Sequence, residues 1–98
     1  MGKPFFVEAL EKSDPQLLDH MNLLHEFAAK DGALPARIKT LMTMLVDAVL
    51  GHPEGVKAIA ERARQQGASE EEIAETVRIA FMCGGMPGLV IGTYAFPK

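Results

Sequence analysis

The stretch 49-VLGHPEGVKAIAERARQQGASEEEI-73 decides the fold of this 98-residue chain. Gly51 is typical of a helix end, and Pro53 suits the first turn of a helix that runs to Gly67. Ser69, with Glu72 three residues later, predicts a capping box that opens the next helix. The stretch therefore predicts two tight connections between three successive helices.

Further helices are predicted on both sides of this stretch. The first covers residues 5–12, and the second runs from about 15 to 30, with Ser13 or Asp14 as its N-cap. A third covers 35–51, and after the helix that begins at 69 a last short one covers 87–96. We expect an all-α fold of five to six helices in a single domain spanning residues 1–98.

Composition narrows the classes of partner and compartment. The formal charge of -3 arises from 13 acidic and 10 basic residues without a basic cluster, so a nucleic-acid partner is not expected. Cys83 is the single cysteine, which excludes an intramolecular disulfide and a Cys-only metal site, and favours the cytoplasm. The charge-free run 79–96 approaches the length of a membrane span, but Gly84, Gly85 and Pro87 interrupt it, so no membrane partner is expected.

The helix predicted over 35–51 is apolar around most of its circumference. After Lys39, only Thr40, Thr43 and Asp47 are polar, and they form one strip at about 100° per residue. Such a helix must be covered on more than one side, and a short chain has few helices to do so. We therefore expect an obligate homo-oligomer.

Two other helices show narrower apolar stripes that predict partial burial against a core. These stripes consist of Leu17, Met21, Leu24 and Ala28 in the second helix, and of Val56, Ile59, Ala60 and Ala63 in the fourth.

Three motifs carry a resemblance to a known family: "DGALPARIKTL" (31–41), "VLGH" (49–52) and "ARQQGASEEEI" (63–73). On these motifs, residues 15–96 resemble the carboxymuconolactone decarboxylase family, which includes the alkyl hydroperoxidase D-like proteins. The resemblance implies the all-helical alkyl hydroperoxidase D-like fold and assembly as a homotrimer or homohexamer.

The resemblance also implies where chemistry would lie. In the hydroperoxidase branch a glutamate, a CxxC pair and a histidine form a dithiol site, and these positions fall here on Thr40, on His52 and Gly55, and on Ile59. All four residues differ from that pattern. Because a dithiol cycle needs two thiols and a base, alkyl hydroperoxidase activity of the CxxC type is not expected.

The decarboxylase branch lacks the cysteine pair and has a small hydroxyl residue near Thr40, but it keeps the histidine that falls on Ile59. Decarboxylation leaves a carbanion-like centre that needs a proton donor, which isoleucine cannot be. We expect a cofactor-free reaction on a small carboxylated or lactone substrate, with His52 or His25 in place of the missing histidine. The catalytic candidates are His52, His25 and Thr40.

Several alternatives remain open at this stage. His52 at a helix N-cap could bind an anionic ligand or be a solvated turn residue. Asp47 could line a cavity with Thr40 and Thr43 or face solvent. His20 and His25 are five residues apart, a spacing that does not favour a shared metal ion, so no metal site is expected.

Two further functions are compatible with the sequence. The protein could be a non-catalytic oligomer that binds a small ligand in the family pocket. It could also act as a single-cysteine peroxidase through Cys83, although a small buried residue is the expected role of that cysteine.

Overall fold

The computed structural model describes residues 4–97. The chain forms two compact units, and the boundary between them in the sequence falls between Lys30 and Asp31. Every regular element in the described residues is helical, which confirms the predicted all-α class. Residues 1–3 and 98 of the predicted single domain lie outside the described residues, and that domain prediction stays a prediction. The two units are described separately below.

The first unit consists of two helices, α1 (Phe5–Ser13) and α2 (Pro15–Ala29), which pack against each other. Asp14 is the N-cap of α2, because its carboxylate accepts the Leu17 N–H at 3.0 Å. The buried residue of α2 is Leu18, whereas Leu17 and Leu24 of the predicted apolar stripe are exposed. Of the predicted stripe only Met21 is partly buried, so the prediction of partial burial is wrong for Leu17, Leu24 and Ala28 within the chain.

The second unit contains α3 (Ala36–Leu50), α4 (Pro53–Gln65), α5 (Glu70–Gly92) and a 3-10 turn, η1 (Thr93–Ala95). Gly51 (φ 84°) and Gly67 (φ 97°) adopt left-handed conformations after α3 and α4, as expected where these helices end. At the start of α5, Ser69 Oγ accepts the Glu72 N–H, and the Glu72 carboxylate accepts the Ser69 N–H, both at 3.0 Å. The capping box and the three-helix reading of residues 49–73 are therefore confirmed.

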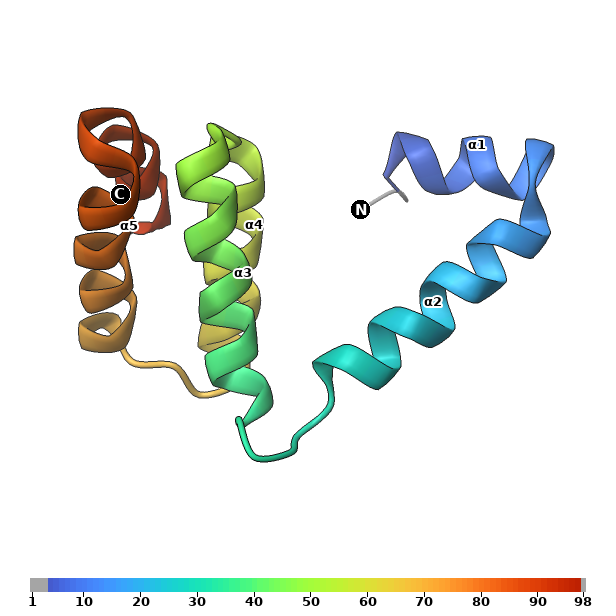
Figure 1. Ribbon diagram of the computed structural model, residues 1–98, viewed down its shortest axis with the longest axis horizontal. Coiled ribbons are helices and arrows are strands. Elements are labelled where there is room, and N and C mark those ends of the chain that lie inside the picture. Colours follow the sequence, from blue (N-terminus) through green and yellow to red (C-terminus); the bar gives the residue numbers. More distant parts are fainter. Residues whose placement is uncertain (1–3, 98) are drawn as a thin grey trace. The chain divides into compact units, whose positions relative to one another are not determined.

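Helix α5 is not straight, because the chain reverses at Gly85 (φ 65°, ψ -154°). A Cβ atom on Gly88 would collide with the carbonyl oxygen of Ala80, and one on Gly92 would lie 3.0 Å from Val77 Cγ1. The segment after Gly85 therefore returns antiparallel to the segment before it, as Figure 1 shows. This reversal supports the prediction that two helices meet at Gly84 and Gly85.

The reversal also bears on the membrane question. By length and composition, Glu70–Ala95 is long and apolar enough to cross a membrane. Only the part before Gly85 is continuous, however, and 15 helical residues extend about 22 Å, less than the roughly 30 Å of a hydrocarbon core. The described helix therefore does not form one spanning segment.

The core of the second unit lies between α3, α4 and α5. Its largest fully buried side chains are Met44, Val56 and Ile73, one from each helix. Most other core residues are small, which lets the helices approach closely; they include Ala48, Ala60, Ala63, Ala80 and Ala95. The predicted stripe of α4 is confirmed, because Val56, Ala60 and Ala63 are buried and Ile59 packs against the core.

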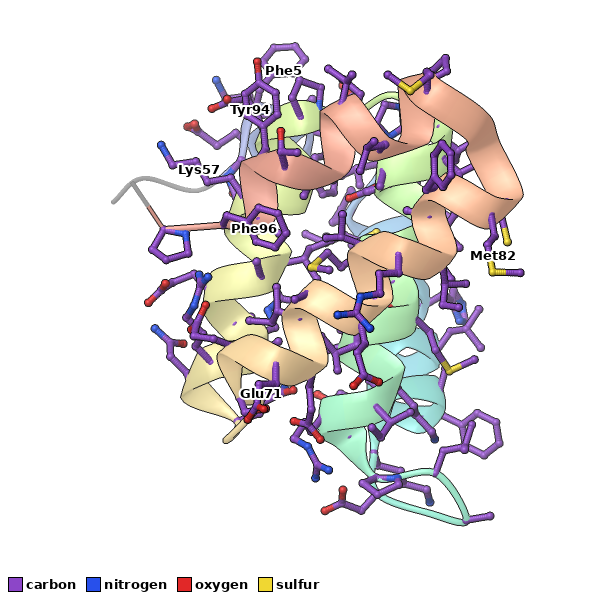
Figure 2. The ribbon with its side chains drawn as sticks, turned by 90° about the vertical axis from the view of Figure 1, so that its left-hand side faces the viewer. Phe5, Lys57, Glu71, Met82, Tyr94 and Phe96 are labelled. Atoms are coloured by element: carbon purple, nitrogen blue, oxygen red, sulfur yellow. The ribbon has the colours of Figure 1, made fainter. Side chains whose placement is uncertain are left out.

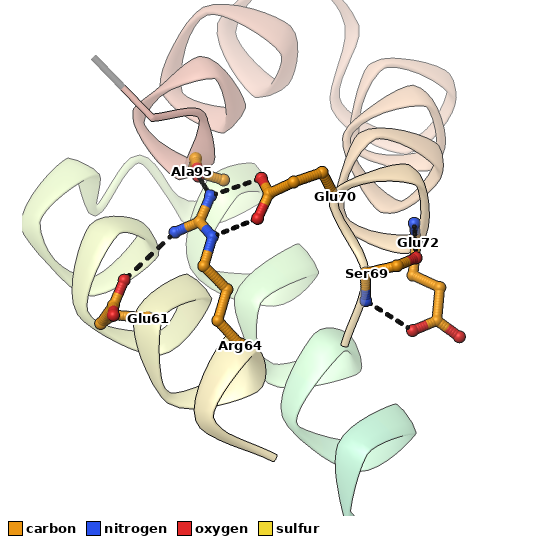
Figure 3. Close-up of polar contacts among 6 residues, drawn as sticks. All are labelled: Glu61, Arg64, Ser69, Glu70, Glu72 and Ala95. Atoms are coloured by element: carbon orange, nitrogen blue, oxygen red, sulfur yellow. Dashed lines mark hydrogen bonds and ion pairs between the residues drawn. The ribbon is translucent and has the colours of Figure 1, made fainter. Parts of the chain in front are cut away.

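Two arginines connect the ends of these helices through charged hydrogen bonds. Arg64 of α4 donates to Glu70 at 2.6 and 2.9 Å, to the Ala95 carbonyl at 2.7 Å and more weakly to Glu61 (Figure 3). Arg37 of α3 donates to both oxygens of Glu72. Arg64 thereby holds the C-terminal turn against α4 and the start of α5.

These contacts shift the titration of both glutamates. The hydrogen bond from Arg64 lowers the pKa of Glu70. The hydrogen bond from Arg37, aided by the Ser69 N–H, lowers the pKa of Glu72. Each carboxylate is therefore stabilised in its ionised form by the fold.

The close approach at Gly88 predicts a strong effect of one methyl group. Gly88→Ala is expected to reduce the free energy of unfolding by about 1–3 kcal/mol, because the added Cβ meets the Ala80 backbone and not a movable side chain. Urea unfolding followed by circular dichroism measures this. Gly32→Ala is the matched control, because the nearest atom to its added Cβ is Lys39 Nζ at 4.0 Å. Equal stability of the two variants would contradict the packing at the reversal.

The lowered pKa of Glu70 predicts a pH dependence of stability. The unfolded glutamate takes up its proton at a higher pH than the folded one, so the contribution of the Arg64 contact is complete above the ordinary glutamate pKa and is lost as pH falls through the folded value. Between about pH 7 and about pH 3, the melting temperature of the wild type should fall more than that of Glu70→Gln. Glu71→Gln, which changes an exposed acid in the same turn (Figure 2), should follow the wild type. Parallel curves for wild type and Glu70→Gln would refute the assignment.

Candidate functional site

The turn between α3 and α4 brings together an acid and a histidine. Asp47 lies in the last turn of α3, and His52 is the N-cap residue of α4. Asp47 Oδ1 and His52 Nδ1 are 3.1 Å apart, and the backbone N–H of His52 donates to the Asp47 carbonyl at 2.9 Å. The left-handed Gly51 between them allows the chain to turn tightly enough to make both contacts.

The second carboxylate oxygen of Asp47 lies next to Gly55 of α4. A Cβ atom built on Gly55 would collide with Asp47 Oδ2 and lie 3.0 Å from Asp47 Cγ. The carboxylate thus fills the space that a side chain at position 55 would need. The first turn of α4, which could have received an anionic ligand, lies beside a carboxylate of the protein itself.

The geometry of this pair determines what His52 can do. An ionised carboxylate only accepts hydrogen bonds, so the contact requires a hydrogen on His52 Nδ1. Nε2 then remains available, and the His52 side chain is 58% exposed, compared with 22% for Asp47. A histidine held by one nitrogen and accessible at the other is suited to proton transfer.

Thr40 and Ile59 are the other two positions that the resemblance implies, and neither takes part in the hydrogen bond between Asp47 and His52. Thr40 is half-buried on α3, seven residues and therefore about 10 Å along the helix from Asp47. Ile59 packs against the core of the second unit. Position 59 is thus a packing position in this chain, and the structure does not bring Thr40 within hydrogen-bond reach of the acid and histidine pair.

His25 lies in the first unit, on the last turns of α2, and is exposed. It lines an open surface depression formed by that helix end, together with Leu23, Glu26, Phe27, Ala29 and Lys30. His20 is also exposed on α2. Within residues 4–97, no group of three or more His, Cys, Asp or Glu side chains is arranged to hold a metal ion.

Cys83 is exposed on α5, two residues before the reversal at Gly85. The expectation that it is a buried packing residue is wrong for the single chain. Val77 and Ala80 take the buried positions of this part of α5, and Cys83 lies on another side of the helix.

The pairing of Asp47 with His52 was not predicted from the sequence, which left Asp47 between a cavity and solvent. A signal was present in hindsight: the two residues are five apart and flank a helix-ending glycine. In an uninterrupted helix, residues five apart do not lie on the same face. The turn at Gly51 is therefore what brings the side chains of Asp47 and His52 into contact.

Comparison with known proteins identifies the class of protein. The profile of the carboxymuconolactone decarboxylase family matches residues 15–92. The chain therefore belongs to this family, as the resemblance implied. Among curated proteins, it is 28% identical over 87 residues to an uncharacterised protein of Cupriavidus necator, covering 89% of this chain and 77% of that one. It is 24% identical over 84 residues to an uncharacterised protein of Methanocaldococcus jannaschii, covering 86% of this chain and 78% of that one.

Solved structures agree with this assignment. A carboxymuconolactone decarboxylase family protein from Legionella pneumophila matches with a TM-score of 0.83 and 28% identity, covering 91% of this chain and 80% of that one. A Burkholderia xenovorans protein, crystallised as a candidate carboxymuconolactone decarboxylase, matches with a TM-score of 0.82 and 24% identity over 96% of this chain and 77% of its own. The second likeness concerns the fold alone.

Proposed function

We propose that this protein is a cofactor-free enzyme of the decarboxylase branch, acting on a small carboxylated or lactone substrate, with His52 as its proton-transfer residue. The observation that carries the proposal is the contact of His52 with Asp47. The contact uses Nδ1 and leaves Nε2 of this exposed side chain accessible. His25, the other sequence candidate, lines an open depression, and its ring has no comparable contact among those identified in residues 4–97. Thr40 remains a candidate for contacting the substrate.

The proposed step is the exchange of carbon dioxide for a proton. The bond between the substrate carbon and its carboxylate breaks, and the electron pair stays on that carbon. His52, protonated on both nitrogens, delivers its Nε2 hydrogen to form the new C–H bond, and water restores the proton afterwards. Nδ1–H stays bonded to Asp47 throughout, so the orientation of the ring is the same before and after the transfer.

We also propose that the active form is a homo-oligomer, a trimer or hexamer, in the cytoplasm, without a nucleic-acid or membrane partner. The packing of the second unit supports self-association. Helices α3 and α5 approach closely, because Val49 Cγ2 lies 3.3 Å from the position that a Cβ atom on Gly84 would take. Both helices also carry exposed apolar side chains. These include Met42, Val46 and Leu50 on α3, and Ile79, Met82 and Met86 on α5; Figure 2 shows Met82 projecting outward from α5.

The exposure of Cys83 favours a second candidate function, single-cysteine peroxide reduction. In that reaction the thiolate attacks the peroxide, releases an alcohol or water and becomes a sulfenic acid. Two external thiols then restore the Cys83 thiol, the first by forming a mixed disulfide with loss of water and the second by reducing that disulfide. Peroxide consumption that persists in Cys83→Ser would exclude it.

The enzymatic proposal predicts turnover that depends on His52. Purified protein with carboxymuconolactone should form product, followed by its absorbance, and His52→Gln should lower kcat by about 100-fold, the usual contribution of a proton-transfer group. His25→Gln is the matched control and should retain the wild-type rate. Full activity of His52→Gln would contradict the role of His52. A ligand that raises the melting temperature without being converted would identify a binding module instead.

If the exposed apolar side chains of α3 and α5 form the contact between subunits, charged residues introduced there should weaken the assembly. The wild type at micromolar concentration should sediment as a trimer or hexamer. Val46→Glu combined with Met82→Glu should shift it towards monomers, because both side chains would carry the same charge in a contact that the assembly buries. Arg62→Glu, an exposed change on α4, should leave the assembly intact. A monomeric wild type in analytical ultracentrifugation would contradict the proposal.

A further inference from the structure

The contact between Asp47 and His52 has a third participant, the empty side-chain position of Gly55. Asp47 reaches His52 Nδ1 with one oxygen, at 3.1 Å, while its other oxygen occupies the space over Gly55. Any side chain at position 55 would compete for this space. The observed position of the carboxylate, from which it holds the imidazole, therefore requires glycine at position 55.

The backbone at position 55 does not itself require glycine. Gly55 lies in the first turns of α4, and it is not among the glycines with positive φ, which are Gly51, Gly67 and Gly85. In a helix, alanine is intrinsically preferred over glycine. The glycine at this position is therefore explained by the side-chain space that Asp47 uses, not by the conformation of the chain.

We propose that Asp47 is a positioning residue for His52, and that Gly55 provides the space from which it acts. The carboxylate keeps the hydrogen on Nδ1, so that Nε2 is directed to a substrate approaching the exposed side of the turn. This inference deepens the proposed function, and its catalytic part rests on that function. Asp47 does not touch the reacting atoms and acts only through the imidazole.

The inference has a readout that does not depend on activity. The ring ¹⁵N chemical shifts of a neutral histidine distinguish the tautomer with hydrogen on Nδ1 from the one with hydrogen on Nε2. His52 is identified among the three histidines by the signals that disappear in His52→Gln. In the wild type, neutral His52 is expected to carry its hydrogen on Nδ1.

Two variants test the inference from different sides. Asp47→Ala removes the carboxylate, and Gly55→Ala displaces it with a Cβ atom while leaving both Asp47 and His52 unchanged. Both are expected to lose the preference for the Nδ1–H tautomer. Glu54→Gln is the control, because it neutralises an exposed acid in the first turn of α4 and should keep the tautomer of the wild type. Because alanine favours the helix, loss of folding is not expected in Gly55→Ala.

Activity measurements add the catalytic part. With carboxymuconolactone, Asp47→Ala and Gly55→Ala should each lower kcat by about 100-fold, with KM changed by less than about threefold because substrate contacts stay in place. A residue with a purely structural role would not produce this selective loss of kcat in a folded variant.

The outcomes separate this inference from the proposed function. The expected tautomers without turnover of any lactone would overturn the proposed function and support the positioning of His52 by Asp47. Hydrogen on Nε2 in the wild type, or an unchanged tautomer and kcat in Gly55→Ala, would overturn the positioning role even if the lactone is converted.

Discussion

The close approach of three helices at small side chains is the constraint on which the rest of the structure depends. Ala48, Ala60 and Ala80 are buried where α3, α4 and α5 meet, and Gly88 lies against the Ala80 carbonyl after the chain reverses. Because backbones are this close, larger side chains cannot be accommodated without moving a helix. The close packing of α3 against α4 also fixes the positions of the end of α3 and the start of α4, where the candidate site lies.

The site is a consequence of how one helix ends and the next begins. Gly51 stops α3 in a left-handed conformation, and His52 then starts α4 within reach of the acid in the preceding turn. The imidazole and carboxylate are therefore supported by two helix ends whose positions the core determines. A site on such supports needs few residues, since the fold supplies the orientation that a longer loop would lose to conformational entropy.

This chain belongs to the family but does not carry the residues of the dithiol site that the resemblance implies. The family model matches residues 15–92, yet the chain has a single cysteine and an isoleucine that packs against the core at position 59. Chemistry belongs to sites and not to folds. The acid and histidine at the turn after α3 lie where the resemblance places the cysteine pair, and they are the groups through which we propose proton transfer.

Sequence alone determined the helices, because their signals are local: Pro15 and Pro53 at starts, Gly51 and Gly67 at ends, and the capping box at Ser69 and Glu72 depend only on neighbouring residues. It also indicated an apolar α3 that needs cover from more than one side. Tertiary structure alone decided that Leu18 and not Leu17 is buried, that Cys83 is exposed, and that Asp47 meets His52 over Gly55. The physical reason is that burial and side-chain contact depend on how the helices are placed, and periodicity along one helix does not specify which side its neighbour will cover.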